Sequence, residues 1–529
     1  MLNFKKSTWL SLVAGTALLL IPAVLAPTSV QAQAKKGGTL IYVHANGPRH
    51  LNGAVQSGSV TAIPGTQIFA SPLRFDANWQ PQPYLAESWK MSDDQLSLTL
   101  NLRKNAKFHD GKPITSADVA FSLMTVKKNH PFKTMFAAVS KVDTPDPHTA
   151  IIRLSRRHPA IILAMSPALL PILPKHIYDD GTNVRKHPHN LKPFVGSGPF
   201  KFVEMKKGQH IILERNPDYF LPNRPYLDKI IIQIQRNRTS IALGLKKGEF
   251  HLHSFASNTR QIMQLKSEKN LTVTSKGYEG IGPVAWLSFN FKNEQLKHKK
   301  VRQAIAYAID RKFITNSLFS GLAKLAPGAI AGGHPLAGKT RELYDVDIAK
   351  ANKLLDEAGF PRKDDGFRFK LRVDSTNSAR NISEYLKPQL KKIGVNIVLR
   401  ISPDFSTWLA HIKSHDFDLN LETLFNWGDP IIGVHRSYLT SNIRKGVAWS
   451  NTESYSNPVV DKLLAKAGLE TDETKRKAIY AEFQKIVWDE LPVYWLMAAP
   501  YHTIASKKVG NVPTTIWGTA APMDEVYLK

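Results

Sequence analysis

The 529-residue sequence contains no cysteine. This absence excludes disulfides, thiolate metal ligands and a lipid-modified cysteine, so hydrophobic packing must hold the chain together. Acidic residues are scarce: 43 Asp and Glu stand against 71 Lys and Arg, which gives a formal net charge of +28. The sequence also lacks fixed-period repeats, low-complexity tracts and, apart from one N-terminal run, apolar stretches long enough to cross a bilayer.

The excess of basic residues does not follow the pattern of a nucleic-acid-binding protein. Lysines occur as scattered pairs such as Lys127-Lys128, Lys206-Lys207 and Lys299-Lys300, and no basic helix with interleaved stacking aromatics occurs. We therefore expect a solvated basic surface and no nucleic-acid partner. Anionic surfaces of the cell envelope would be attracted to this charge.

The N-terminus has the three parts of a signal peptide. Lys5-Lys6 precede an apolar run from Trp9 to Ala26, and small residues then lead to Ala32-Gln33-Ala34. This order predicts export with cleavage after Ala34, which leaves a soluble protein in the periplasm of a Gram-negative cell. An uncleaved membrane anchor is the alternative, but prolines at the end of the run disfavour it.

Hydrophobic periodicity predicts alternating strands and helices and hence an α/β fold. Residues 35–529 exceed the size at which a single core keeps growing, so at least two lobes are expected. The predicted strands include Gly38–Val43, Ile151–Leu154, Lys229–Gln235 and Val395–Ile401, and the predicted helices include Val301–Ser317, Ser378–Ile393 and Asp472–Asp489 with Thr471 as N-cap.

The most informative block runs from Asn101 to Leu123. An alternating strand ends at Leu102, a turn follows at Asp110–Pro113, and Thr115 or Ser116 caps a helix that carries Asp118 in its first turn. The block resembles the signature of the peptide/nickel class of solute-binding proteins that serve ABC importers. Six more segments match this family in its order along the chain: Ala86–Trp89, Gly196–Phe202, Glu214–Phe220, Val301–Ile314, Ala351–Pro361 and Leu390–Leu399.

The resemblance implies a two-lobed periplasmic binding protein fold (type II, cluster C) with an extra inserted domain. Lobe I would comprise residues 35–68, 196–282 and 501–529, the extra domain residues 69–195, and lobe II residues 283–500. Two chain crossings, near Gly280–Gly282 and Ala498–Pro500, would act as hinges.

The function implied by the resemblance is that of a receptor and not of an enzyme. The protein would bind a short peptide or peptide-like solute between its lobes as a monomer, without a cofactor or resident metal, and present it to an inner-membrane ABC permease. Relatives that carry haem, nickel complexes, opines or sugars provide the alternative ligand classes. Two histidine pairs, His251-x-His253 and His187-x-His189, keep haem or a metal complex open.

Enzymatic motifs fail on their context. Gly333–Thr340 spells GxxxxGK[ST], but the sequence before it is not a strand, and Pro335 lies inside the loop. Gly196-Ser197-Gly198-Pro199 lacks the spacing of a nucleophile elbow and is expected to be a tight turn in which the glycines supply positive φ. No group of nucleophile, base and orienter emerges, so an exported hydrolase or chaperone is only the third hypothesis.

The family resemblance also suggests how a peptide would be held. In Phe425–Pro430 (FNWGDP), matching the family's Gly-Asp-Pro places Asn426 where peptide binders carry an aspartate for the ligand ammonium, whereas a shifted register makes Asp429 the anchor. Arg380 aligns with an arginine that receives the ligand carboxylate. The predicted aromatic walls of the site are Trp408, Trp427, Tyr438 and Trp449.

Overall fold

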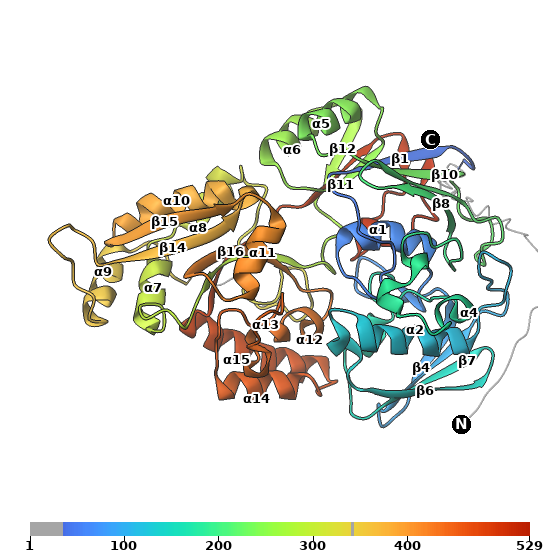
Figure 1. Cartoon of the computed structure of the whole chain (residues 1–529), viewed down its shortest axis with the longest axis horizontal. Coiled ribbons are helices and arrows are strands. Elements are labelled where there is room, and N and C mark those ends of the chain that lie inside the picture. Colours follow the sequence, from blue (N-terminus) through green and yellow to red (C-terminus); the bar gives the residue numbers. More distant parts are fainter. Residues whose placement is uncertain (1–34, 340–342) are drawn as a thin grey trace, which may run out of the picture. The chain divides into compact units, whose positions relative to one another are not determined.

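The computed structural model describes residues 35–339 and 343–529, so the predicted leader and its cleavage site lie outside the described residues. Residues 35–529 belong to one structural unit. Within the described part, none of the helices is both long and apolar enough to span a membrane. Three sheets organise this unit (Figure 1).

A seven-stranded sheet collects strands from three distant stretches of sequence. Its order is β12-β18-β11-β1-β10-β9-β8, in which β1 runs parallel to both β10 and β11. The strands are β1 (Thr39–His44), β8 (Phe200–Lys206), β9 (His210–Arg215), β10 (Lys229–Ile234), β11 (Leu252–Ala256), β12 (Leu271–Thr274) and β18 (His502–Ser506). All seven fall inside the ranges predicted for lobe I. The domain boundaries themselves remain a prediction.

A four-stranded antiparallel sheet lies within residues 86–154. Its order is β4-β5-β7-β6, formed by β4 (Ala86–Met91), β5 (Ser97–Leu102), β6 (Val139–Asp146) and β7 (Thr149–Leu154). Helix α2 (Ser116–Asn129) packs on it and starts as the sequence predicts, because Thr115 and Asp118 form a capping box.

The five-stranded sheet has the order β15-β14-β16-β13-β17. Its strands are β13 (Pro283–Phe289), β14 (Phe369–Thr376), β15 (Val395–Ser402), β16 (Leu419–Phe425) and β17 (Val493–Ala498). Helix α10 (Arg380–Lys391) buries Ile382, Leu386 and Leu390 in the same core as the inward side chains of β14. Helix α11 (Phe405–Lys413) instead buries Trp408 and Ile412 in a small separate cluster.

The other strands and α-helices complete the described part. The remaining strands are β2 (Leu73–Phe75), β3 (Pro81–Pro83), β19 (Val509–Gly510) and β20 (Tyr527–Leu528). The remaining helices are α1 (Ser59–Ile68), α3 (Ile161–Ala164), α4 (Lys175–Tyr178), α5 (Arg238–Lys247), α6 (Thr259–Lys266), α7 (Lys299–Tyr307), α8 (Arg311–Phe313), α9 (Ile348–Glu357), α12 (Pro430–Gly433), α13 (His435–Tyr438), α14 (Pro458–Ala467) and α15 (Glu473–Glu490).

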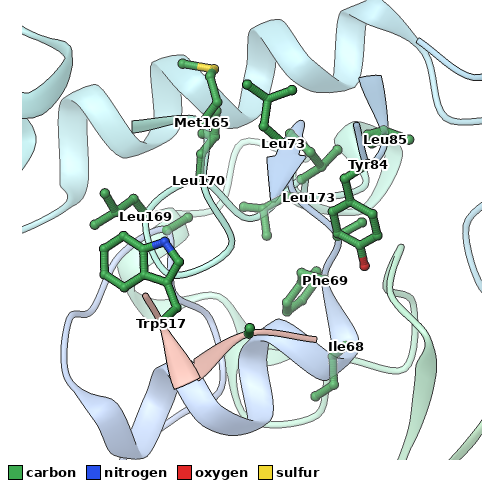
Figure 2. Close-up of a cluster of buried hydrophobic side chains, with 14 of the residues drawn as sticks. Ile68, Phe69, Leu73, Tyr84, Leu85, Met165, Leu169, Leu170, Leu173 and Trp517 are labelled. Atoms are coloured by element: carbon green, nitrogen blue, oxygen red, sulfur yellow. The ribbon is translucent and has the colours of Figure 1, made fainter. Parts of the chain in front are cut away.

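One hydrophobic core joins segments that are far apart in sequence. Figure 2 shows Ile68 and Phe69 at the end of α1 near Tyr84, with Leu169 beside Trp517 from the C-terminal segment. All five side chains are at most 1% exposed. Because Trp517 is buried among these side chains, the C-terminal segment is part of this core. Burial of this kind contributes roughly 25 cal/mol per Å² of apolar surface.

Three predicted helices differ from the structure at their ends. The predicted helix 301–317 is interrupted after Tyr307, because the Asp310 carboxylate accepts a hydrogen bond from the Phe313 amide and starts α8. The predicted helix 378–393 begins at Arg380 after a single 3-10 turn. The prediction of Thr471 as N-cap is wrong, because the Asp472 side chain accepts from the Lys475 amide at 2.8 Å.

The glycines of Gly196-Ser197-Gly198 serve a different purpose from the predicted one. Neither adopts positive φ. A Cβ at Gly196 would lie 2.2 Å from the Ile68 carbonyl oxygen, and a Cβ at Gly198 would lie 2.4 Å from the Gln67 carbonyl oxygen. The segment therefore needs glycine for close backbone approach to the end of α1.

Candidate functional site

The Asn426-Trp427-Gly428 segment is bonded to the first predicted hinge. The amides of these residues donate to the carbonyls of Gly282, Ile281 and Gly280 at 3.1, 3.2 and 2.6 Å. The second predicted hinge lies alongside, because the Ala499 amide donates to the Pro283 carbonyl at 3.2 Å. The segment that the sequence singles out is thus built into the place where the chain passes between the two large sheets.

Residues 69–195 contact this region at three points. The ring centroids of Phe132 and Trp427 lie 5.8 Å apart, and the guanidinium carbon of Arg436 lies 4.4 Å from the centroid of the Phe132 ring. A Cβ at Gly428 would approach the Leu163 side chain to 2.4 Å. Trp79 donates its indole N–H to the Gly333 carbonyl at 3.1 Å. Trp427 and Gly428 therefore lie at a contact between residues 69–195 and the segment that follows β16.

Asn426 is buried and its side chain is already bonded. Its Oδ1 accepts from the Ala331 amide at 2.6 Å, and its Nδ2 donates to the Ala329 carbonyl at 3.4 Å. This residue fixes the loop at Ala329–Ala331.

Asp429 is held in a buried bidentate pair with Arg476. Both carboxylate oxygens lie 2.7 Å from guanidinium nitrogens of Arg476, and one oxygen also accepts from the Ile431 amide. Burial alone would raise the pKa of Asp429, but Arg476 holds this pKa at about 2. The negative charge of Asp429, which a ligand ammonium would meet, is thus already neutralised by Arg476. The sequence did not single out this arginine.

Arg380 lies in the first turn of α10 and is half exposed. Its Nε donates to Asn377 Oδ1 at 3.0 Å, and its Nη1 lies 3.4 Å from Glu384 Oε1. None of the described contacts joins Arg380 to the Asn426–Asp429 segment.

The four predicted aromatic residues fall into separate places. Trp427 adopts a φ of 51° and packs between Phe132, Phe425 and Trp517. The ring centroids of Trp408 and Trp449 lie 6.0 Å apart, and Trp408 donates its indole N–H to Asn420 Oδ1 at 2.9 Å. Tyr438 of α13 is 1% exposed.

The histidine pairs have backbone partners. His253 is hydrogen-bonded to the Val43 carbonyl at 2.9 Å, and burial lowers its pKa to about 4. His251 accepts from the Ile41 amide at 3.1 Å, and His187 accepts from the His189 amide at 3.3 Å. In the part of the chain that the structure describes, no three or more His, Asp or Glu residues are grouped so as to hold a metal ion.

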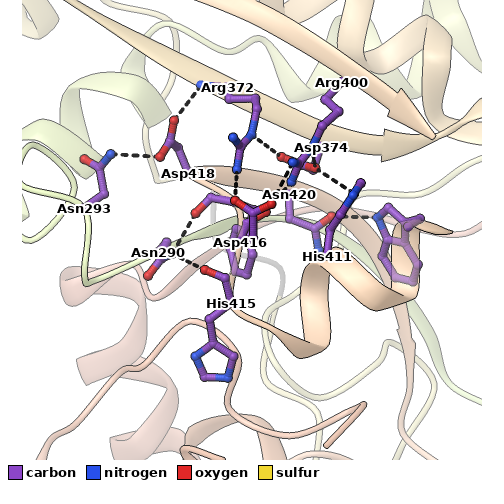
Figure 3. A network of polar contacts seen from close by, with 12 residues as sticks. Asn290, Asn293, Arg372, Asp374, Arg400, His411, His415, Asp416, Asp418 and Asn420 are labelled. Atoms are coloured by element: carbon purple, nitrogen blue, oxygen red, sulfur yellow. Dashed lines mark hydrogen bonds and ion pairs between the residues drawn. The ribbon is translucent and has the colours of Figure 1, made fainter. Parts of the chain in front are cut away.

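A network of ion pairs covers one face of β14 and β15 (Figure 3). Asp374 is fully buried and is paired with Arg372 and Arg400. Asp416 lies 2.6 and 2.8 Å from the same two arginines. Both Asp374 and Asp416 have arginines beside them, so these ion pairs are complete without a ligand, and Asp418 nearby accepts from the Arg372 amide and from Asn293.

A second group of acidic side chains was missed from the sequence. The register of β13, β16 and β17 places Trp286 opposite both Glu422 and Trp495. The Trp286 indole N–H is shared between Glu422 Oε1 and Ser288 Oγ, each at 3.0 Å, and Ser288 donates to Glu453 Oε1 at 2.8 Å. We call Glu422 and Glu453, with Tyr438 and Asn420 beside them, the Glu422–Glu453 cluster.

The Glu422–Glu453 cluster has polar atoms without partners. Among the described residues, Glu453 Oε2, the Tyr438 hydroxyl and Asn420 Nδ2 are buried and make no hydrogen bond. Burial raises the pKa of Glu422 to about 7, and burial together with the charge of Glu422 raises the pKa of Glu453 to about 8. The sequence signal for this group was a glutamate in the middle of the strand Leu419–Phe425, whose leucines at 419, 421 and 424 are buried.

Comparisons with known proteins match this architecture. The family model of bacterial extracellular solute-binding proteins, family 5 Middle, matches residues 80–445. A Brucella ovis relative, named as an ABC transporter peptide-binding protein, is 30% identical over 459 residues and is aligned over 84% of this chain and 83% of its own length. Heme-binding protein A of Haemophilus influenzae is 28% identical over 500 residues, with 89% of this chain and 88% of that protein covered.

A solved structure shows the same fold. It is that of the oligopeptide-binding protein AppA from Bacillus subtilis in complex with a nonapeptide, and it superposes with a TM-score of 0.80 at 24% identity. The match covers 94% of this chain and all of that one. The predicted α/β, two-lobed binding-protein fold is thereby confirmed.

Proposed function

Because the chain belongs to family 5 of the bacterial extracellular solute-binding proteins, we propose that this ABC-importer component binds short peptides in the region around Trp427. The observation that carries the proposal is the position of Asn426–Gly428, which is bonded to the predicted hinge and contacts Phe132 and Leu163 across from it. A ligand held there would bridge both sides, so binding and closure would be coupled.

The family resemblance supports the roles of the individual residues, because, of these residues, only Asn426, Trp427 and Asp429 belong to the segment at the predicted hinge. Trp427 supplies a rigid aromatic wall, with Tyr438, Trp408 and Trp449 as further walls, and Arg380 receives the peptide carboxylate when the lobes close. Asn426 and Asp429 hold the site in shape, because their side chains are bonded to Ala331 and Arg476. The lobe boundaries proposed above place both hinges beside this segment.

Calorimetry against a library of di- to nonapeptides tests the binding, and small-angle scattering tests closure. We expect at least one peptide to bind and to reduce the radius of gyration. Failure of every peptide to bind, together with no compaction, would contradict the proposal. Native mass spectrometry of protein purified from its own periplasm distinguishes a peptide from haem, a nickel complex, an opine or a sugar.

The cellular setting is proposed from the leader and the family. The mature protein would begin at Lys35, act in the periplasm as a monomer, and deliver its solute to an inner-membrane permease. N-terminal sequencing of the periplasmic protein tests the cleavage site, and light scattering tests the monomer. An intact leader or a stable dimer would overturn the respective statement.

A further inference from the structure

Glu453 is an exception among the buried acids of the described chain. Asp374, Asp429 and Asp524 each lie within 3.1 Å of an arginine nitrogen. Buried Asp118 accepts hydrogen bonds from two backbone amides. Glu453 is 1% exposed, and the groups beside its carboxylate are the hydroxyls of Ser288 and Thr452 and its own backbone amide, with no cation among them. A carboxylate buried without a cation keeps a proton instead, and a cation that arrived there would take the place of this proton.

The nearest cation does not supply that partner. Arg436 attracts Glu422 electrostatically, but its Nε and Nη2 donate to the carbonyls of Gly433 and Phe425 at 3.0 and 3.2 Å. Its Nη1 is buried without a hydrogen bond among the described residues. Arg436 balances the charge of one ionised glutamate, and the second glutamate keeps its proton near neutral pH. A monocation would balance the second carboxylate once that proton has left.

The unpartnered atoms have the chemistry of an ammonium site. Tyr438 is 1% exposed, and its hydroxyl interacts electrostatically with both Glu453 and Glu422. Together with Glu453 Oε2 and the Glu422 carboxylate, this hydroxyl oxygen offers three acceptors. A primary ammonium has three donors on a compact charge, whereas a guanidinium is planar and larger.

The Glu422–Glu453 cluster is connected to the proposed binding region. Glu422 and Arg436 are partly exposed, whereas Glu453 is buried behind them. Glu422 lies on β16, the strand that leads directly to Asn426, and Arg436 contacts Phe132 on the other side of the interface. Glu422 is the more exposed of the two glutamates, so a ligand group that reaches the cluster would meet Glu422 before Glu453.

We propose that the Glu422–Glu453 cluster receives a primary ammonium group of the transported solute, in the role that the sequence assigned to Asn426 or Asp429. This inference rests on the proposed peptide-binding function. The ammonium is either the free N-terminus of a peptide or a lysine side chain. Its arrival forms ion pairs with carboxylates that have no such partner in the described structure.

The test uses the mature protein and three peptide probes: tetra-alanine, N-acetyl-tetra-alanine, and the N-acetylated peptide with lysine in place of its first alanine. Calorimetry should show that acetylation weakens binding of tetra-alanine at least tenfold. Recovery of affinity with the lysine peptide identifies a side-chain ammonium, and no recovery identifies the N-terminus. Equal binding of free and acetylated tetra-alanine, with no gain from lysine, overturns the proposal and leaves peptide binding intact.

Variants then assign the site to these residues. Glu422→Gln and Glu453→Gln should each weaken the ammonium-bearing probe at least tenfold and leave the weaker, acetylated probe unchanged. Glu482→Gln, which changes an exposed carboxylate on α15, is the matched control and should bind as wild type. Thermal unfolding confirms that each variant is folded. Wild-type affinity in both folded variants would overturn the assignment, whereas failure of wild type to bind any library peptide would overturn the proposed function as well.

A second measurement separates an electrostatic anchor from a structural role. Because burial holds protons on these carboxylates, ammonium binding at pH 7.5 should release protons. Calorimetry in two buffers of different ionisation enthalpy measures this release. Loss of the release in Glu453→Gln supports the proposal, and an unchanged release contradicts it.

Discussion

The five-stranded sheet and its connections carry two acidic regions that differ in how their charge is balanced. At Asp374 and at Asp429, buried carboxylates are matched by Arg372, Arg400 and Arg476. In the Glu422–Glu453 cluster, two carboxylates share hydrogen bonds from Trp286 and Ser288. Asn420 lies between the regions: its Oδ1 accepts from Trp408, whereas its Nδ2 is unpartnered in the described structure.

The difference indicates which region holds shape and which receives a ligand. A buried ion pair whose partners are all present resists change, because removing one member leaves an uncompensated charge. A region with buried, unpaired groups destabilises the unliganded fold and gains most when a partner arrives. We therefore expect mutations in the paired region to act on stability and mutations in the Glu422–Glu453 cluster to act on binding.

The largest expected effect comes from breaking the Asp429–Arg476 pair. Arg476→Met leaves the Asp429 carboxylate buried without its cation, which should lower the free energy of unfolding by about 3–5 kcal/mol. Urea unfolding followed by circular dichroism measures this change. Adding Asp429→Asn to the same chain should restore part of the loss. A single variant as stable as wild type would show that Asp429 is not held by charge pairing.

The second effect is a pH dependence from the Glu422–Glu453 cluster. The pKa values of both glutamates are higher in the folded protein than the ordinary value of 4.5, which applies to the unfolded chain. Between pH 4.5 and about 8 the folded protein therefore holds more protons than the unfolded chain. Stability contributed by these groups is therefore present at low pH and is lost as pH rises through this window. At about 1.4 kcal/mol for each pKa unit, the loss should amount to several kcal/mol.

The measurement compares wild type with the Glu422→Gln/Glu453→Gln double variant. Buried histidines such as His253 have lowered pKa values and make stability fall at acidic pH in both proteins, so only the difference reports the glutamates. Arg436 and Tyr438, which face the cluster, remain charged and neutral respectively over most of this range. Parallel stability curves for the two proteins between pH 5 and 8 would contradict the assignment.

The sequence predicted the parts of the fold that depend on local patterns. The start of α2 at Thr115, one of the two expected caps, and the apolar alternation of β5 depend on residues close in sequence, and both were predicted. The N-cap at Asp472 was missed by one residue, because Thr471 and Asp472 are both good caps and only the backbone geometry decides. The prediction of one continuous helix from Val301 to Ser317 was wrong for a related reason, because the apolar stripe continues across the Asp310 cap.

The candidate site was less predictable, because its chemistry depends on partners far away in sequence. Asp429 looked free to bind a ligand until Arg476, 47 positions later, proved to hold both of its oxygens. Glu422 and Glu453 come together through Trp286 and Ser288, which lie 136 and 165 residues before their respective partners. A single sequence without an alignment does not provide these pairings.

The third prediction concerns Arg380, whose exposed pair contrasts with the buried one at Asp429. Arg380→Ala should change the stability of the unliganded protein by less than about 1 kcal/mol, because an exposed pair with Glu384 contributes little. If Arg380 receives the peptide carboxylate on closure, the same change should weaken a peptide by about thirtyfold, which corresponds to about 2 kcal/mol. Amidating the peptide C-terminus should weaken wild-type binding similarly and leave Arg380→Ala unaffected. Equal affinities throughout would remove Arg380 from the site.

The smallest effect, and the sharpest contrast, comes from two buried tyrosines. Tyr438 and Tyr455 are each 1% exposed, but the Tyr455 hydroxyl donates to Glu490 whereas that of Tyr438 is unpartnered among the described residues. Tyr455→Phe should cost about 1–2 kcal/mol, because Glu490 loses a partner. Tyr438→Phe removes a hydroxyl that is costly to bury, so the unliganded protein should keep its stability or gain about a few tenths of a kcal/mol.

In the ligand test, the order of the two variants should reverse. Tyr438→Phe should bind the ammonium-bearing peptide several-fold more weakly, whereas Tyr455→Phe should bind it normally. Stability losses of equal size in both variants would show that Tyr438 is as well bonded as Tyr455, and the distinction between the paired and unpaired regions would then fail at this residue.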